Sequence, residues 1–143
     1  MSYKFLEGLT VADVAFEATG KTVEELFESA GLAVTNTMVK DLDSVKQKTK
    51  RKFKVEAENT EMLLYKFLQE IIFYKDSDML LFNKFDFDFI PKKLGWELKV
   101  TAHGEKLDMN KHEMLVDVKA VTFHQYKVEE TKNGWKAQVI LDI

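Results

Sequence analysis

Most of this chain alternates apolar with polar residues, and this alternation restricts its fold more than any other feature of the sequence. Phe85, Phe87 and Phe89 alternate with charged residues, and a period of two places three phenyl rings on one face of a β-strand. The same period recurs over 52–58 and 96–103. Each of these segments predicts a strand that turns one face toward a core.

Two segments follow the helical period instead. From Val23 onward, apolar residues recur every three or four positions, which predicts a helix over 23–39. Thr22 and Glu25 have the spacing of a capping box, in which each side chain accepts a hydrogen bond from a free amide at the helix start. A second stripe predicts a helix over 61–75 with Asn59 or Thr60 as N-cap. Extra apolar residues beyond that stripe, at positions 62, 63, 73 and 74, indicate burial on more than one side.

The predicted order is strand, strand, helix, strand, helix and four strands, without a linker or a repeat. We expect one α+β domain over 1–143, in which two helices pack on one face of an antiparallel or mixed sheet. Pro91–Gly95 is predicted to be a turn, and Asn133–Gly134 a two-residue turn with two positive φ angles between strands over 116–129 and 135–142. A change of phase at Ala120/Val121 predicts a β-bulge there.

Composition narrows the class of protein. The 143 residues suit one domain, and the absence of cysteine excludes disulfides, thiolate metal sites and a cysteine nucleophile. No apolar run approaches the roughly 20 residues that span a bilayer, and the N-terminal residues lack the apolar core of a secretory signal. We therefore expect a cytoplasmic protein with no membrane partner. The net charge of −3 argues against a dedicated nucleic-acid binder and against a DNA partner.

Common catalytic motifs are absent from the sequence, including glycine-rich phosphate loops and the GxSxG and HExxH strings. The three histidines, His103, His112 and His124, are irregularly spaced. They would form a zinc site only if the fold brought them together. The favoured interpretation is that each makes its own hydrogen bonds.

One strong run of positive charge lies between Lys46 and Lys54, where every second residue is a lysine. In a strand these lysines would all point the same way. The run could contact RNA phosphates or an acidic partner. The favoured interpretation is a solvated face or edge that prevents further strands from adding to the sheet.

Acidic groups gather at the C-terminal end of the chain. Asp142 projects away from the predicted inward face of the last strand and is followed by Ile143, whose main-chain oxygens are also donors. Ca²⁺ and Mg²⁺ prefer carboxylate and carbonyl oxygens, so a third acidic group nearby would complete a cation site. Asp13, near the start of an early alternating stretch, is such an acid, although its spacing alone does not place it there. The alternative is a solvated, frayed strand end.

Several strings of residues resemble the archease family, and the resemblance covers essentially the whole chain. They lie at 5–7, 12–13, 20–27, 63–70, 104–105, 118–124 and 139–143, and the last two, Val-Lys-Ala-Val-Thr-Phe-His and Val-Ile-Leu-Asp-Ile, are the most specific. Many family members carry His-Thr-Ala-Asp where this chain reads Leu9-Thr-Val-Ala-Asp13. Asp13 matches the aspartate of this motif. The histidine is missing and Thr10 is displaced or replaced, so the roles of the motif's histidine and threonine are not carried over to this chain.

The resemblance implies a small α+β protein that is not itself an enzyme. Archeases are protein cofactors of RtcB-type RNA-splicing ligases: they promote transfer of GMP to the ligase's active-site histidine and so sustain multiple turnovers in tRNA splicing. Contact with tRNA would be indirect. Two alternatives stay open, a stand-alone metal-dependent hydrolase and a chaperone-like RNA-binding module.

The resemblance also implies a set of site residues. The divalent-metal site of the family corresponds here to Asp13, Asp142 and Ile143, the last through a terminal or backbone oxygen, with calcium, magnesium or manganese as the ion. Lys119 corresponds to a lysine linked to activation, which would contact a phosphate or a carboxylate at the ligase active site; a structural ion pair is its alternative role. His124 is expected to orient its neighbours.

Overall fold

The structure is a computed structural model, and it describes residues 2–9 and 13–143. The elements in order are β1 (Ser2–Leu6), β2 (Val14–Gly20), α1 (Val23–Met38), a 3₁₀ turn (Leu42–Ser44), β3 (Thr49–Ala57), α2 (Thr60–Asp78), β4 (Leu80–Lys92), β5 (Gly95–Lys106), β6 (Ala120–Thr131) and β7 (Gly134–Asp142). This confirms the predicted α+β class and the predicted order of helices and strands.

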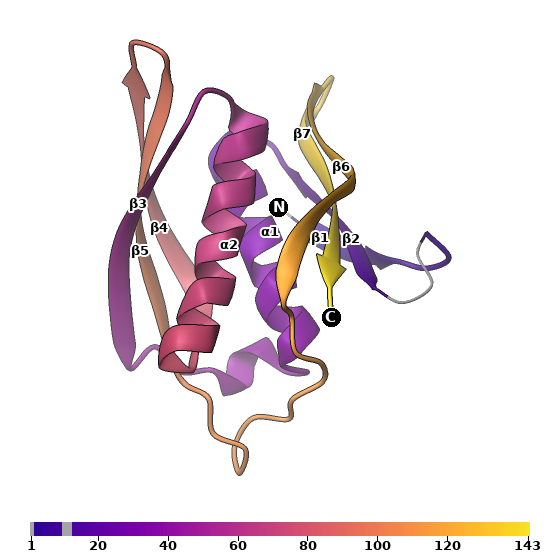
Figure 1. Ribbon diagram of the computed structural model, residues 1–143, viewed down its shortest axis with the longest axis vertical. Coiled ribbons are helices and arrows are strands. Elements are labelled where there is room, and N and C mark those ends of the chain that lie inside the picture. The colour runs from indigo at the N-terminus through magenta and orange to yellow at the C-terminus, as the bar shows by residue number, and fades with distance from the viewer. Residues whose placement is uncertain (1, 10–12) are drawn as a thin grey trace.

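The strands form two antiparallel sheets, one in the order β1-β2-β7-β6 and the other in the order β3-β5-β4. Figure 1 shows α1 and α2 between the two sheets, and both helices pack against strands of each one. The prediction had placed the helices on one face of a single sheet. Alternation identifies the inward face of each strand, but it does not specify which strands pair.

Helix α1 begins as its sequence predicts. The backbone N–H of Glu25 donates to Thr22 Oγ1 over 3.1 Å, and the Glu25 carboxylate accepts from the backbone N–H groups of Lys21 and Thr22. The predicted capping box is therefore confirmed. The core-facing side of the helix, including Leu26 and Phe27, is fully buried.

Helix α2 has Asn59 as its N-cap, which accepts a hydrogen bond from the Met62 N–H over 2.8 Å. It runs three residues past the predicted end and stops where Met79 adopts a left-handed conformation. Leu63 lies in the core as expected, but Phe73 is 55% exposed, so the prediction of burial at that position was wrong. Among the described residues, no helix is long and apolar enough to cross a membrane.

Aromatic rings fill the layer between the helices and sheet β3-β5-β4. Phe67 of α2 stacks on Phe27 of α1 and meets Phe85 and Phe87 of β4 edge-on, with ring centroids 5.2–5.7 Å apart. Phe89 completes the row and meets Phe27 edge-on at 5.2 Å. The predicted inward face of this strand is confirmed, and the rings fix the spacing of the two helices above it.

Strand β6 differs most from its prediction. It begins at Ala120 instead of Val116, and its register with β7 breaks between Thr122 and Lys127, beyond the predicted bulge at Ala120/Val121. Within the break Phe123 turns outward, 58% exposed, and stacks on Tyr65 of α2 at 4.3 Å. This contact with the helix accompanies the break in register, and alternation along the strand cannot reveal it.

Both predicted hairpins are present, but their turns are shifted. Pro91 pairs with Trp96 inside the ladder, so the first turn is shorter than predicted. In the second, Thr131 pairs with Gly134, and only the glycine of Asn133–Gly134 has a positive φ, 138°. A Cβ at position 134 would lie 2.3 Å from the carbonyl oxygen of Gly20, so close packing against β2 requires this glycine.

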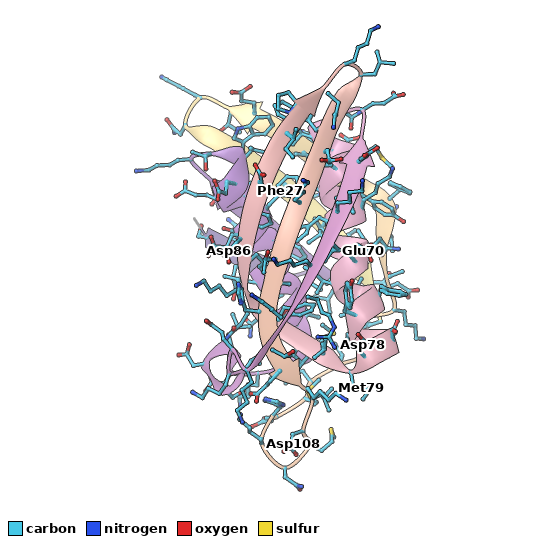
Figure 2. All side chains as sticks on the ribbon, turned by 90° about the vertical axis from the view of Figure 1, so that its left-hand side faces the viewer. Phe27, Glu70, Asp78, Met79, Asp86 and Asp108 are labelled. Atoms are coloured by element: carbon cyan, nitrogen blue, oxygen red, sulfur yellow. The ribbon has the colours of Figure 1, made fainter. Side chains whose placement is uncertain are left out.

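The lysine-rich segment continues into β3, an edge strand of sheet β3-β5-β4. Lys50, Lys52 and Lys54 are exposed on the outer face of the sheet, which Figure 2 views directly, and Lys54 lies 3.7 Å from Glu97 of β5. The expected solvated edge is confirmed; RNA or partner binding by this run stays a prediction.

Candidate metal and partner site

The register of sheet β1-β2-β7-β6 brings the two predicted metal-binding aspartates to the same end of neighbouring strands. The last pair of β2 and β7 is Val14 with Leu141. Asp13 immediately precedes Val14 and Asp142 immediately follows Leu141, so the two aspartates flank the last pair of this ladder. Neighbouring strands in a sheet lie about 4.7–4.9 Å apart, so the start of β2 lies next to the end of β7.

The two aspartates differ in burial. Leu141 is fully buried against the helices, so its neighbour Asp142 projects to the outer face and is exposed, whereas Asp13 is half-buried. Ile143 is half-buried and packs against the core. The isoleucine side chain therefore holds the end of β7 in place and leaves its main-chain oxygens close to Asp142.

The backbone of Lys119 is hydrogen-bonded to the end of β7. Its N–H donates to the carbonyl oxygen of Asp142 over 2.8 Å, and the next residue, Ala120, pairs with Asp142. The Lys119 side chain is exposed. Figure 1 shows the start of β6 beside the end of β7 at the C-terminus. Residues from three distant parts of the chain thus lie at one end of one sheet.

His124 lies apart from this group. It occupies the irregular part of β6 and is exposed, and its Nε2 is 3.3 Å from Gln125 Nε2. Gln125 has a positive φ of 52°, which turns the chain out of the ladder at this point. Of the predicted site residues, Asp142, Ile143 and Lys119 lie together, Asp13 precedes the neighbouring start of β2, and His124 lies farther along β6.

The chemistry of the gathered donors suits a hard cation. Within the described residues, no ion pair joins Asp13 or Asp142 to a basic side chain. The same residues contain no cluster of three or more His, Cys, Asp or Glu side chains able to hold a metal. A cation bound by the two aspartates would therefore need further oxygen donors, such as the main-chain oxygen of Ile143 or water, to complete its shell. Thr10 and Ala12 of the N-terminal motif lie outside the described residues.

Helix α2 supports the segment that carries Lys119, a feature that the sequence did not predict. Lys75 is 5% exposed, donates to the carbonyl oxygen of Val118 over 3.0 Å, and pairs with the carboxylates of Asp76 and Asp117. Burial lowers the pKa of Lys75, but the hydrogen bonds to Asp117 and Asp76 outweigh it, and the pKa is raised. The ammonium is thus charged and fixes the chain immediately before Lys119.

A second hydrogen bond from α2 fixes the chain on the other side of Lys119. The side-chain oxygen of Gln69 in α2 accepts from the backbone N–H of Val121 over 2.8 Å. Gln69 and Lys75 lie in a predicted helix, but their partners are about 40 to 50 residues away along the chain. No local sequence signal identifies such pairings.

The three histidines do not form the zinc site that the sequence left open. His103 of β5 bonds to Asp86 over 2.7 Å, and His112 is buried against Glu105. The described residues contain no metal-binding cluster that includes them. Each histidine has a local partner of its own, as the favoured interpretation expected.

Glu105 is the centre of a separate buried network. It accepts hydrogen bonds from Lys111 Nζ, from the backbone N–H of Lys46 and from His112 Nε2, at 2.7–3.0 Å. His112 Nδ1 in turn accepts from the Asp108 N–H, in the loop at the lower end of Figure 2, so the ring proton resides on Nε2. Burial would raise the pKa of Glu105, but the bonds from Lys111, Lys46 and His112 prevail and lower it to about 2.

Comparison with known proteins decides the family. The model of the Archease protein family matches residues 3–143 of this chain. The chain belongs to the archease family. A protein archease of Methanosarcina mazei is 38% identical over 142 residues, covering 99% of this chain and 95% of its own length. One from Pyrococcus abyssi is also 38% identical, over 92% of this chain and 93% of its own.

Solved structures agree with the archease assignment. The solution structure of Methanobacterium thermoautotrophicum protein 1598 superposes with a TM-score of 0.85 at 36% identity, over 99% of this chain and 98% of that one. The crystal structure of a Thermotoga maritima protein described as an archease, possible chaperone, has a TM-score of 0.62 at 23% identity, over 94% and 93% of the two chains. At that identity the likeness concerns the fold alone.

Proposed function

We propose that this archease is a protein cofactor of an RtcB-type RNA-splicing ligase and that it promotes guanylylation of the ligase and its multiple turnover in tRNA splicing. Family membership supports the proposal. The observation that carries it is the convergence at one sheet end of Asp142, the start of β2 and the exposed Lys119, whose amide bonds to Asp142. Such an exposed end is accessible to the active-site cleft of a partner.

In this proposal Asp13, Asp142 and an oxygen of Ile143 hold a divalent cation, either calcium, magnesium or manganese. The residues fit it because both carboxylates lack an ion-pair partner within the described chain and oxygen donors suit hard cations. When bound, the cation supplies positive charge that can hold a phosphate. Phosphoryl transfer depends mainly on alignment and charge stabilisation, which such a site supplies.

Lys119 is proposed to contact a phosphate or carboxylate of the ligase. Its side chain is exposed while its backbone is fixed by the bond to Asp142 and by Lys75 on the preceding residue. A fixed backbone limits the positions that the ammonium can reach, which lowers the entropic cost of ordering it on binding. His124, farther along β6, is proposed to orient neighbouring groups.

We propose that the archease does not catalyse the reaction itself. The residues at the sheet end hold charge and bind oxygen ligands, and the reacting histidine and nucleotide would belong to the ligase. The two alternatives, a metal-dependent hydrolase and a chaperone-like RNA-binding module, make different predictions for the same purified protein.

A guanylylation time course tests the proposal. Labelled GMP on the ligase is followed with and without wild-type archease, Asp142→Asn and Lys119→Ala. Because loss of even an outer partner of a metal ligand costs about 10- to 100-fold in metal affinity, we expect Asp142→Asn to lower activation at least about tenfold. Asp88→Asn, which changes an exposed aspartate on the other sheet, is the matched control and should activate like wild type.

Three results would contradict the proposal. Ligase turnover that wild-type archease does not change would remove the activator role. Hydrolysis of GTP or RNA by the archease alone would favour the hydrolase. RNA binding that falls steeply with salt and is lost when the lysines of 46–54 are reversed in charge would favour the RNA-binding module.

A further inference from the structure

A small apolar pocket lies between the two sheets at the end of the molecule where both helices begin. Its volume is about 250 Å³. Its walls come from the starts of α1 and α2, where Thr22 and Leu63 lie, and from Phe89, Trp96 and Trp135 on three strands of the two sheets. Figure 1 shows the start of α2 and the β6–β7 turn at this end and the C-terminus toward the other. The nine residues of β7 separate the pocket from Asp142 by roughly 25 Å.

Both tryptophans of the chain line this one pocket. Each follows a glycine with positive φ, Gly95 at 128° and Gly134 at 138°. A Cβ on either glycine would lie 2.3 Å from a carbonyl oxygen of a neighbouring segment, so tight packing positions the backbone that carries each indole. The ring of Phe89 is held by its edge-on contact with the buried Phe27, which is labelled in Figure 2. Packing against neighbouring segments therefore fixes the positions of the aromatic residues that line the pocket.

Trp96 is 38% exposed, although burial of so large an aromatic side chain would be favourable. Packing within the chain thus leaves part of the indole surface uncovered, and this residue lines the pocket. A ligand small enough for the pocket would cover it.

The side-chain charge at the pocket is negative. Glu24 is the one charged residue among the described residues that line it. Glu25, next in the chain, already places its carboxylate at the start of α1, where it accepts from the N–H groups of Lys21 and Thr22. Burial, and then repulsion by Glu24 and Glu25, raise the pKa of Glu28 one turn further on. This accumulation of acids disfavours an anionic ligand.

Three aromatic rings and one carboxylate are the groups that recognise alkylated ammonium ions, because the ring faces are electron-rich and methyl groups pack against them. We propose that the pocket of Phe89, Trp96, Trp135 and Glu24 binds the alkylammonium group of a small organic cation. The size of the pocket, below the range typical of drug-sized ligands, suits a single such group. This site lies apart from the proposed metal site and is independent of the ligase proposal.

Choline and 3,3-dimethyl-1-butanol test the proposal, since they share a shape and differ in charge. Tryptophan fluorescence reports binding directly because both tryptophans lie at the site. We expect a saturable change with choline, no change with equal concentrations of NaCl, and about 5- to 30-fold weaker binding of the neutral alcohol. A peptide with one trimethyllysine is titrated in parallel; tighter binding of that peptide than of choline would identify a protein source for the same cationic group.

Single substitutions test whether choline binds at this pocket. Glu24→Gln should weaken choline binding several-fold, whereas Glu61→Gln should not. Glu24 and Glu61 both occupy the second position of a helix, but Glu61 does not line the pocket, so it controls for the charge at a helix start. Trp135→Leu should also weaken binding, with Trp96 remaining as the reporter. Circular dichroism and thermal unfolding confirm that each variant is folded.

The proposal would be overturned by equal affinity for choline and the alcohol, which would indicate a plain apolar hollow. It would also be overturned by the absence of saturation with both cationic probes, or by choline affinity that Glu24→Gln and Trp135→Leu leave unchanged.

Discussion

At the residue scale, the buried Glu105 is a side chain whose charge contributes to stability. Its carboxylate is 6% exposed and receives hydrogen bonds from Lys46, Lys111 and His112. Glu105 belongs to a Gly-Glu pair in the sequence. Its hydrogen-bond donors lie in the loop after β5 and in the segment before β3, where neither the helical nor the strand period of apolar residues applies. The sequence therefore did not predict this network.

Glu105→Gln should reduce the pH dependence of the free energy of unfolding below about pH 4.5. The pKa of Glu105 in the folded protein is about 2, below its ordinary value of 4.5, so its contribution is complete above about pH 4.5 and is lost as the pH falls toward 2. The difference corresponds to roughly 3 kcal/mol. Urea unfolding between pH 2 and 7 measures it, with Glu58→Gln at an exposed position as control. Parallel curves for wild type and Glu105→Gln over pH 2–4.5 would contradict the assignment.

Lys75→Met should loosen the segment before Lys119 more than it loosens the rest of the protein. The substitution leaves the carbonyl oxygen of Val118 without its donor, an expected cost of about 1–3 kcal/mol. Hydrogen exchange of the Lys119 amide, which bonds to Asp142, should accelerate by more than the exchange of Val100 in β5.

Lys66→Met, on an exposed position of the same helix, is the control for Lys75→Met. It should leave the exchange of Lys119 close to that of wild type. Equal acceleration at Lys119 and Val100 in Lys75→Met would show a general loss of stability and no local role for Lys75.

At the scale of elements, sequence periodicity was most informative where one local rule decides the structure. The start of α1 follows from Thr22 and Glu25 alone, and its end lies within one residue of the prediction. Strand β6 follows from tertiary contacts instead: Phe123 stacks on Tyr65, and the Tyr126 hydroxyl donates to the Glu61 carbonyl over 2.7 Å. Those contacts join β6 to residues of α2 that lie more than 50 positions earlier, so the bulge could not be located from its own sequence.

Gly134→Ala should destabilise the β6–β7 hairpin. An alanine here would have an unfavourable positive φ, and its Cβ would lie 2.3 Å from the carbonyl oxygen of Gly20. We therefore expect the free energy of unfolding to fall by about 3 kcal/mol or more. Gly8→Ala is the matched comparison, since Gly8 also has a positive φ, 77°, but no atom within 4 Å of an added Cβ; it should cost about 1 kcal/mol. Thermal unfolding measures both, and equal losses would contradict the role of the close contact.

At the scale of the whole molecule, the division into two sheets positions the candidate site. Sheet β1-β2-β7-β6 pairs an N-terminal strand with the last strand, and this pairing brings the start of β2 to Asp142. The acidic residues could be picked from the sequence and from the resemblance to archeases. Their proximity depends on strand order and register, which the alternation of individual strands leaves undetermined.

We propose that Asp13 and Asp142 hold one cation beside Lys119. Nuclear magnetic resonance with Mn²⁺ tests this site, because the ion broadens the amide signals of the residues closest to it. We expect selective broadening at the start of β2, the end of β7 and the start of β6, abolished by Asp142→Asn and retained in Asp88→Asn. Broadening centred elsewhere, or unchanged by Asp142→Asn, would contradict the account.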